Sequence, residues 1–380
     1  MKLTFNLIAL AILLNVSQVF SQMTDNWKWL NPSPQGNTLY SIDFIDNNTG
    51  YTTGEFGTIL RTTNAGSDWD QLTGGTNKDI TAMDFADANT GYIGGHRQFF
   101  SKTTNAGLSW QQLTLPVQGN WDTAYTVMDI QALTPQVIYA AGFFQLESKI
   151  WKSTNGGTSW EIQSTGSFNY IQKLYFIDQN TGFAMGGALG GEIIRTSNGG
   201  ASWLPVFQES YTVYSMCFIS PTIGIAGCES GRVYRTTDAG LTWNFALSPS
   251  SLDINSIQFT NSLTGYGFGT GSVYVKTTDG GLNWDELPLG TGGLRLYYDA
   301  AVTPNGNLHA AGSYGALIRS TNSGNTFVSQ PYVTENSLTD IEFINSSIGY
   351  AVAGFGAGDI LKTTDAGETW VSQISSYTLP

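Results

Sequence analysis

Residues 236–243 read T-T-D-A-G-L-T-W, and residues 277–284 read T-T-D-G-G-L-N-W. Both stretches follow one pattern, which we call the box: a hydroxyl pair, Asn or Asp, a small residue, Gly, two variable positions and an aromatic. Copies of the box start at Thr62, Thr103, Ser153, Thr196, Thr236, Thr277, Ser320 and Thr363. The shared glycines lie 40 to 50 residues apart. A period near 40 is typical of propeller blades or solenoid coils.

Each repeat predicts four short strands joined by Asn-, Gly- and Thr-rich turns. In the first repeat these are residues 39–45, 50–54, 58–62 and a fourth starting at Trp69. Four antiparallel strands per repeat predict an all-β fold, a β-propeller, whose radial closure protects the sheet edges. Eight copies of the inner strand favour eight blades, centred on Phe44, Phe85, Ile130, Phe176, Phe218, Phe259, Val302 and Phe343, with seven as the alternative.

A ninth copy of the strand that follows a box complicates the blade count. The segment W-K-W-L-N-P-S-P-Q-G-N at residues 27–37 has this character. It predicts an amino-terminal strand that pairs with the last blade and closes the ring, leaving the carboxy-terminal tail redundant.

The Asn or Asp of each box is predicted to be structural. Its side chain accepts hydrogen bonds from its own turn, while the Gly two residues later supplies a positive φ and the aromatic packs beneath. Asn and Asp replace each other freely at this position of the box, whereas a catalytic or metal-binding site would require the carboxylate. The residues at this position are Asn64, Asn105, Asn155, Asn198, Asp238, Asp279, Asn322 and Asp365. We also expect the Lys or Arg before each box to pack its stem and reach solvent with its charge.

This repeat resembles the Asp box, also called the bacterial neuraminidase repeat. With the preceding G-Y-x-x-G strand, the spellings at residues 236–243 and 277–284 are similar to the photosystem II stability and assembly factor family. The resemblance covers about residues 27–375. The resemblance implies a non-enzymatic propeller that holds assembling membrane-protein subunits. In that family the proposed contact is a patch of arginines, and this sequence shows no comparable cluster of arginines.

Residues 1–21 are predicted to be a secretory signal peptide, and residues 22–380 a single propeller domain. Lys2 precedes an apolar stretch to Leu14, and Val19 and Ser21 suit a cleavage site. We therefore expect a secreted or periplasmic protein, cleaved near Ser21. No later apolar stretch is long enough for membrane insertion, and a net charge of -13 argues against nucleic acid as a partner.

Cys217 and Cys228 leave two alternatives open, a disulfide or two buried thiols. The two histidines, His96 and His309, lie in different parts of the repeat. Neither these residues nor the cysteines have metal-site spacing, so no metal and no cofactor is predicted.

Catalysis is the less favoured alternative. A sialidase needs several converging arginines, and only Arg97, Arg232 and Arg295 do not precede a box. Another glycosidase would use paired carboxylates. Acids on the inner strands are predicted to ring the central channel, at Asp43, Asp84, Asp129, Asp299 and Glu342.

The opposite face from the boxes is the predicted binding surface, because aromatic and Arg residues gather in its turns and links. The candidate residues are His96, Arg97, Phe99, Phe100, Trp121, Phe143, Phe144, Arg295, Tyr297 and Tyr298. The sequence therefore predicts a secreted, non-enzymatic scaffold that binds a protein partner in the cell envelope or outside the cell. A carbohydrate-active protein, either a lectin-like glycan binder or a glycosidase, remains the alternative.

Overall fold

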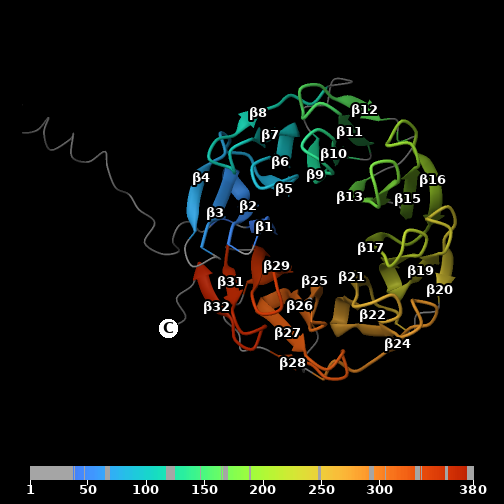
Figure 1. The fold of residues 1–380 in the computed structure, drawn as a ribbon. Helices are drawn as coiled ribbons and strands as arrows, with labels where there is room; N and C mark the ends of the chain where they lie inside the picture. Colours follow the sequence, from blue (N-terminus) through green and yellow to red (C-terminus); the bar gives the residue numbers. More distant parts are fainter. Residues whose placement is uncertain are drawn as a thin grey trace, which may run out of the picture.

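Eight four-stranded antiparallel sheets form a closed ring in the computed structural model (Figure 1). The structure describes residues 37–374 apart from 38, 47, 65–68, 117–124, 146, 164, 166–169, 188–189, 247–249, 291–294, 304, 330–333, 335 and 356–357. The eight-bladed propeller is confirmed, and the seven-bladed alternative is wrong. Among the described residues, no helix combines the length and apolar character needed to cross a bilayer.

Blades 1 to 4 each use four consecutive strands, ordered from the channel to the rim. Blade 1 contains β1 (Leu39–Phe44), β2 (Gly50–Gly54), β3 (Thr58–Thr62) and β4 (Asp70–Thr73). Blade 2 contains β5 (Ile80–Phe85), β6 (Gly91–Gly95), β7 (Phe100–Thr103) and β8 (Gln111–Gln112). Blade 3 contains β9 (Thr126–Ala132), β10 (Ile138–Phe144), β11 (Glu147–Ser153) and β12 (Glu161–Gln163). Blade 4 contains β13 (Ile171–Phe176), β14 (Gly182–Gly186), β15 (Gly191–Thr196) and β16 (Leu204–Glu209).

Blades 5 to 8 repeat this order. Blade 5 contains β17 (Val213–Phe218), β18 (Gly224–Cys228), β19 (Val233–Thr236) and β20 (Asn244–Ala246). Blade 6 contains β21 (Ile254–Phe259), β22 (Gly265–Gly269), β23 (Tyr274–Thr277) and β24 (Asp285–Glu286). Blade 7 contains β25 (Tyr297–Val302), β26 (Leu308–Gly312), β27 (Ala316–Ser320) and β28 (Val328–Ser329). Blade 8 contains β29 (Ser337–Phe343), β30 (Gly349–Phe355), β31 (Ile360–Thr363) and β32 (Val371–Ile374).

Among the described residues, short 3-10 turns join the second and third strands in five blades. They are η1 (Glu55–Gly57), η2 (His96–Gln98), η4 (Glu229–Gly231), η5 (Thr270–Ser272) and η6 (Ser313–Gly315). We call these turns the tips. They carry the side chains that later define the candidate site.

One aromatic unit recurs between neighbouring blades and explains the G-Y-x-x-G pattern. Phe85 of blade 2 stacks on Tyr51 of blade 1 with ring centroids 4.2 Å apart, and its edge meets Trp110, 6.3 Å away. Gly91 lies under the same ring, because an added Cβ would come within 2.5 Å of Phe85. An equivalent ring is present in five other blades, whereas blades 3 and 7 have Ala132 and Val302 at this position. Stacked or edge-on ring pairs add to the apolar burial.

The ring closes where blade 8 meets blade 1 (Figure 1). Phe44 stacks on Tyr350 at 4.1 Å, and the Ile42 amide donates to Asp340 Oδ2 at 3.3 Å. The outer strand of blade 8 is β32, from the carboxy-terminal end of the chain. The expectation that this tail is redundant is therefore wrong. The amino-terminal strand proposed at residues 27–37 falls almost wholly outside the described residues, and its pairing stays a prediction.

The boxes that the structure describes in full, the second to the eighth, are hydrogen-bonded turns of the predicted kind. In the second box, Thr103 Oγ1 donates to Asn105 Oδ1 at 2.9 Å and accepts the Gly107 amide at 2.9 Å. Asn105 Oδ1 also accepts the Ser109 amide at 2.9 Å. Two successive residues have a positive φ, Ala106 at 57° and Gly107 at 75°. The small residue before the Gly is therefore part of the turn geometry, because bulky side chains are rare in this region.

Basic residues before the boxes link neighbouring blades, a contact that the sequence did not predict; those with a printed bond to the next box are Lys102, Lys152, Arg195, Arg235 and Lys276. Lys102 Nζ donates to the Gly156 carbonyl of the next box at 2.7 Å and lies 5.5 Å above the Tyr92 ring. Arg195 Nε likewise donates to the Ala239 carbonyl at 2.8 Å. The carbonyls of the adjacent box thus receive these charges, a contact that the expectation of a packed stem and a charge near solvent did not include.

Candidate binding face

The tips and the links between blades form one face of the ring, which we call the link face. The His96 amide donates to the Asp79 carbonyl in the link that enters its blade, at 3.0 Å, and the Ser313 amide donates to Leu296 in the same way, at 2.8 Å. The boxes bond instead to the turns between first and second strands, as the Ala106 amide does to Asn89 at 3.0 Å. The predicted division of the turns between two faces is therefore confirmed.

Two tips expose aromatic rings on strained backbone. Phe56 and Tyr314 have φ values of 53° and 54°, and each is 66% exposed. Bulky residues in the left-handed region cost about 1 kcal/mol or more and persist where the surroundings impose them. Asp79 Oδ1 accepts the Phe56 amide at 3.0 Å, and Ser337 Oγ accepts the Tyr314 amide at 3.4 Å. The neighbouring blade thus holds both rings out into solvent.

A cavity of about 410 Å³ lies beside Tyr314, where blades 6, 7 and 8 meet on the link face. The Arg295 guanidinium lies 5.7 Å from the Tyr314 ring centre. Tyr298 lines the same cavity, together with Leu296, Ser313, Ser337 and Gly271. Two predicted site residues, Arg295 and Tyr298, are therefore brought together, and Tyr314 completes the group.

His96 and Arg97 form a second polar group on this face, at the tip of blade 2. Both are exposed, and His96 Nδ1 lies 3.1 Å from Asp79 Oδ2. Arg97 has a φ of 54°, at the same tip position as Phe56 and Tyr314. These two predicted residues lie on the link face, in a different blade from Arg295.

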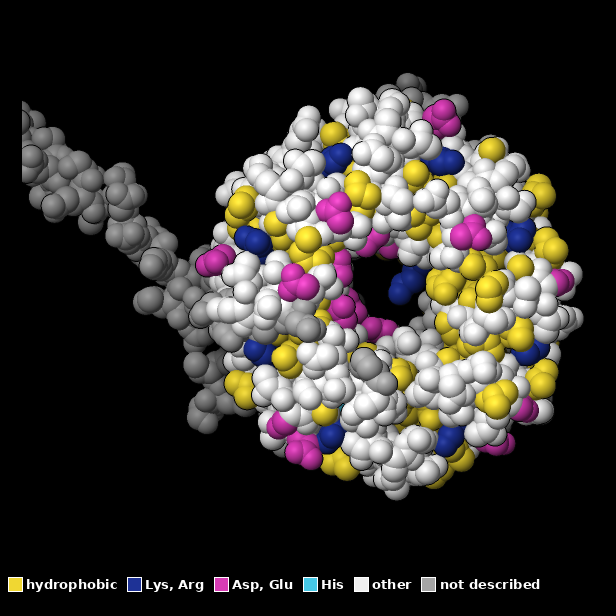
Figure 2. Space-filling view, viewed as in Figure 1, with side chains coloured by type: hydrophobic (Ala, Val, Ile, Leu, Met, Phe, Trp, Pro, Cys, Tyr) yellow, Lys and Arg dark blue, Asp and Glu magenta, His cyan; other side chains and the backbone are white. Residues whose placement is uncertain are grey.

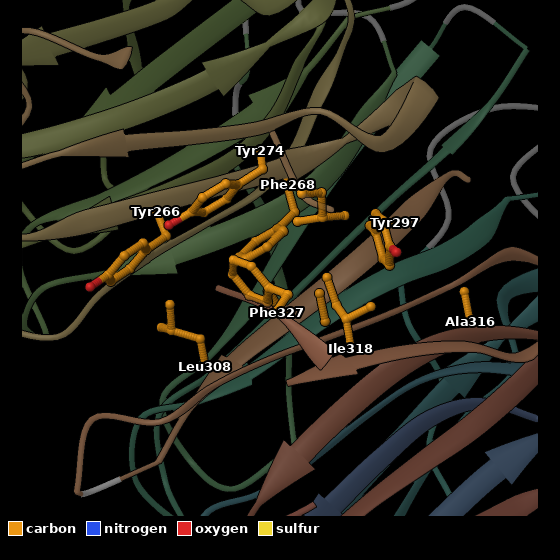
Figure 3. Packing of buried hydrophobic residues seen from close by; sticks show 11 residues of the cluster. Tyr266, Phe268, Tyr274, Tyr297, Leu308, Ala316, Ile318 and Phe327 are labelled. Atoms are coloured by element: carbon orange, nitrogen blue, oxygen red, sulfur yellow. The ribbon is translucent and has the colours of Figure 1, made fainter. Parts of the chain in front are cut away.

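Three predicted site residues are buried rather than exposed, which corrects the sequence analysis. Phe99, Phe100 and Tyr297 are 2%, 0% and 1% exposed. Tyr297 packs among Phe268 and its neighbours in the core between blades 6 and 7 (Figure 3). Neighbouring blades cover both faces of a blade, so the consecutive rings Phe99 and Phe100 are buried in the cores on either side of blade 2. In the sequence, an aromatic looks the same whether it is buried or exposed.

Phe143 and Phe144 are half-buried. Phe143 packs on Tyr170 with ring centroids 3.9 Å apart, and Phe144 lies 6.2 Å from buried Tyr125. Changing both would loosen blade 3, so they are poor probes of binding. Trp121 lies outside the described residues.

The inner strands carry an arc of carboxyl groups in the central channel. The group comprises Asp299 on β25, Asp340 and Glu342 on β29, Asp43 on β1, Asp84 on β5 and Asp129 on β9. Figure 2 shows Asp and Glu side chains gathered on one side of the opening. The predicted ring of acids is thus an arc over five consecutive blades, and Asp340 was missed although it alternates with Glu342.

These carboxyl groups join neighbouring blades. Asp84 Oδ2 accepts the Ala132 amide at 2.6 Å, and Asp129 Oδ2 accepts the Leu174 amide at 2.7 Å. Burial raises the pKa of Asp84 to about 7 and the pKa of Asp129 to about 6. Burial and the neighbouring charge of Asp43 raise the pKa of Glu342 to about 9. Several of these groups therefore keep a proton in the folded protein near neutral pH.

The other side of the channel is polar and carries a cation. A cavity of about 280 Å³ is lined there by Lys173, Tyr175 and Asn255, with Asp129 and Asp299 at its ends. The Lys173 charge lowers the pKa values of Asp129 and Asp340 against the larger effect of burial. In the described part of the chain, no group of three or more His, Cys, Asp or Glu residues is placed to hold a metal ion.

The two cysteines are free thiols. Cys217 is paired across the ladder with Ile225, whereas Cys228 is paired with Val213 at the far end of the same strand pair. Residues four positions apart on a strand are about 13 Å apart, far beyond the reach of a disulfide. The disulfide alternative is therefore wrong; burial raises the pKa of the Cys217 thiol to about 12.

The three arginines considered for a sialidase do not converge. Arg97 and Arg295 lie in blades 2 and 7. Arg232 lies in blade 5, with its guanidinium 3.9 Å from the Tyr211 ring centre and 5.2 Å from that of Phe245 on the outer strand β20. The arginines are thus distributed around the link face, as the absence of an arginine cluster in the sequence predicted.

The fold and this face define an eight-bladed, four-stranded β-propeller with a candidate binding surface of tips and links. Residues 20–119 match the sequence model of a family described as photosynthesis system II assembly factor YCF48. The photosystem II assembly lipoprotein Ycf48 of Synechococcus sp. (strain CC9902) is 23% identical over 156 residues, which are 40% of this chain and 46% of that protein. The aligned region is thus less than half the length of this curated relative. The predicted resemblance to an assembly factor-like propeller is confirmed.

Solved structures agree with the fold. A structure described as YCF48 bound to D1 peptide superposes with a TM-score of 0.60 at 19% identity, covering 90% of this chain and 96% of that one. A GH74 enzyme from Niastella koreensis gives 0.53 at 14% identity, covering 90% of this chain and 67% of the enzyme. At these identities the likeness concerns the fold alone, which binding proteins and enzymes share.

Proposed function

We propose that this protein is a non-enzymatic scaffold that holds extended segments of partner proteins on its link face. The observation that carries the proposal is the pair of exposed rings, Phe56 and Tyr314, held on strained backbone by neighbouring blades. Rigid exposed aromatics are typical of binding hot spots, because they bury much area at little entropic cost. The peptide named with the YCF48 structure supports a protein segment as the kind of partner.

The proposed site of action is the cell envelope or the outside of the cell, following removal of a signal peptide near Ser21. The apolar stretch after Lys2 supports export. The net charge of -13 supports a partner other than nucleic acid.

Carbohydrate binding or cleavage is the second candidate, and one observation favours it. Asp84 and Asp129 lie on adjacent inner strands with raised pKa values, as a general acid requires. Both, however, already accept backbone amides of the next blade, which gives them a structural role. Sugar release from a polysaccharide that disappears in Asp84→Asn and Asp129→Asn would reverse the ranking.

The scaffold is tested by cross-linking the tagged protein without residues 1–21 in native envelope extracts. The probe variant is Phe56→Ser with Tyr314→Ser; the control is Leu108→Ser, which removes an equally exposed apolar side chain (66%) from the box face. We expect one specific protein to be captured by the wild type and the control and lost with the probe variant. Equal capture by all three proteins would refute the link face as the site.

A further inference from the structure

We propose that the central channel contains a specific binding site for a small monocarboxylate, formed by Lys173 and by the inner edges of β17 and β21. The site is separate from the tips of the link face, so the inference goes beyond the proposed function. It uses the channel cavity of about 280 Å³. This volume is roughly that of nine water molecules in the liquid, which suits a small acid or the end of a peptide chain.

Carboxyl groups of one blade cap the inner edge of the next blade. The innermost strand of each blade is the edge of its sheet, so alternate amides of that strand point away from the strand partner and towards the channel. At one such position, three amides are accepted by an Asp of the preceding blade. The pairs are Leu174 with Asp129 at 2.7 Å, Ile42 with Asp340 at 3.3 Å and Ile341 with Asp299 at 3.5 Å. The channel itself thus shows how a carboxylate binds this edge.

The equivalent amides of β17 and β21 have no such acid. They belong to Met216 and Ile257, and the Asp positions of the preceding blades are occupied by Lys173 and Ser215. Within the described part of the chain no side chain accepts either amide, and Ser215 Oγ is buried without a partner. The side chains of Met216 and Ile257 are 9% and 3% exposed in the cores between blades, so it is their backbone that lines the cavity.

Lys173 supplies a positive charge at the same wall. It is the only basic residue on the eight inner strands, and Figure 2 shows basic side-chain atoms within the opening of the ring. Its ammonium makes no hydrogen bond with another described residue and acts on Asp129 and Asp340 through its charge. One ammonium and two amides therefore offer donors to the same cavity, and such a group of donors is typical of anion sites.

The charges at the ends of the cavity favour an anion with a single carboxylate. Asp129 and Asp299 lie there, and each already accepts a backbone amide. One negative charge is balanced by Lys173, whereas a second would lie near these two carboxylates and be repelled. Dicarboxylates and phosphate, which carry close to two charges near neutral pH, are therefore disfavoured. A bound carboxylate has the same two oxygens as the Asp side chains that cap the other inner edges, so we expect it to accept the Met216 and Ile257 amides in the same way.

Ligand-observed NMR at constant ionic strength tests the site with propionate as the probe. The comparison ligands are propionamide, its neutral counterpart, and succinate and phosphate, which carry a second charge. We expect propionate to bind the purified protein at least tenfold more tightly than any of the three. No detectable propionate binding would overturn the proposal, and so would equally tight binding of propionamide, succinate or phosphate.

A pair of hexapeptides identifies the source of the carboxylate. Neither peptide contains an acidic side chain, and they differ only in a free or an amidated carboxy terminus. If the free peptide binds more tightly than propionate, the natural ligand is a chain end; if it binds more weakly, the ligand is a free small acid. The amidated peptide should not compete with propionate, and competition by it would contradict a carboxylate site.

Three variants locate the site in the channel. Lys173→Met removes the charge and should weaken propionate binding at least tenfold, whereas Lys78→Met removes a charge from the link between blades 1 and 2 and should change nothing. Ser215→Asn keeps Lys173 but offers an oxygen to the Ile257 amide, in the manner of Asp299, and should also weaken binding. Equal effects of Lys173→Met and Lys78→Met would indicate diffuse charge and overturn the assignment. Thermal melting checks that each variant is folded; Lys173 is exposed, so its replacement leaves the cores between blades intact.

Failure of this inference is distinguishable from failure of the scaffold proposal. If the wild type captures no envelope protein but binds propionate in a manner that depends on Lys173, the channel site stands and the scaffold role fails. If capture is lost in the Phe56 and Tyr314 variant while the wild type does not bind propionate, the scaffold stands and the channel site fails.

Discussion

His309 occupies a position that a tyrosine holds in most other blades, namely Tyr51, Tyr92, Tyr139, Tyr266 and Tyr350. Its imidazole stacks on Phe343 at 3.9 Å, as Tyr51, Tyr139 and Tyr350 stack on a phenylalanine of the next blade. Burial lowers the pKa of His309 to about 3, so the ring is neutral. Within the described residues, neither ring nitrogen has a hydrogen-bond partner. A tyrosine at this position can reach the next box, as Tyr51 does when it donates to the Ala106 carbonyl at 2.8 Å.

We therefore expect His309→Tyr to stabilise the protein. The change removes two buried polar atoms without partners and adds one hydrogen bond, worth about 1 kcal/mol. Urea unfolding at pH 7.5 measures the gain. His309→Phe is the control, and it should gain only the part of the free energy of unfolding that comes from replacing the imidazole with an apolar ring. If His309→Tyr is no more stable than His309→Phe, the expected hydrogen bond is contradicted.

The box carboxylates are expected to be replaceable by amides but not by methyl groups. Asp238 accepts amides of Leu241 and Thr242 at 3.0 and 2.9 Å, and the Thr242 hydroxyl at 2.7 Å. Asp238→Asn keeps an acceptor, as in the Asn boxes, and should change the free energy of unfolding by less than about 0.5 kcal/mol. Asp238→Ala should cost about 1 to 2 kcal/mol. Equal effects of the two changes in thermal unfolding would argue against the acceptor role.

At the scale of elements, the joint between blades 8 and 1 depends on side-chain packing around β1, β29 and β30. The cluster there includes Leu39, Ile42, Tyr350 and Val352. Blade 8 itself is completed by β32, which pairs with β31 through three residue pairs. Loss of β32 would leave β31 as an exposed edge beside this joint.

Ending the chain at Trp370 should therefore destabilise the fold by about 2 kcal/mol or more, from roughly three backbone hydrogen bonds and the burial around Trp370. Calorimetry of this truncated protein measures the effect. A chain that ends at Ile374, with β32 intact, is the control. If both truncations melt together, another segment replaces β32, as the prediction for residues 27–37 would require.

At the scale of the whole molecule, the carboxyl arc links stability to pH. Glu342 has a folded pKa of about 9 and an ordinary value of 4.5. Between these values the folded state holds a proton that the unfolded state has released, so the free energy of unfolding falls as the pH rises towards 9. Each carboxyl that stays protonated contributes about 1 kcal/mol per pH unit.

The expected result is a lower melting temperature at pH 9 than at pH 7, with a smaller drop in Glu342→Gln. The interval from pH 7 to 9 avoids His309, whose lowered pKa acts in the opposite direction below about pH 6.5. Asp178→Asn is the control, because hydrogen bonds from the amides of Thr181 and Asn180 lower the pKa of Asp178, which is ionised throughout. A melting temperature that does not change with pH would contradict the buried protons.

Much of the candidate site depended on information that the repeats do not contain. His96, Arg97, Arg295 and Tyr298 were found because polar and aromatic residues in tips and links break the repeat. Phe56 and its exposure were missed, since one aromatic before a glycine carries no sign of a left-handed φ. The strand ends of blade 1, in contrast, were predicted within one residue.

The sequence by itself determined the four strands of each blade and the turn at each box, and it favoured eight blades over seven, because these features follow from local contacts repeated at a fixed period. Only the tertiary structure decided which aromatics face inward, as Tyr297 does, and which remain exposed, as Tyr314 does. It also decided that Arg295 lies beside Tyr314 and that the channel acids form an arc. These outcomes depend on contacts between neighbouring blades, whose residues are typically more than 40 positions apart, and no local pattern specifies how such residues meet.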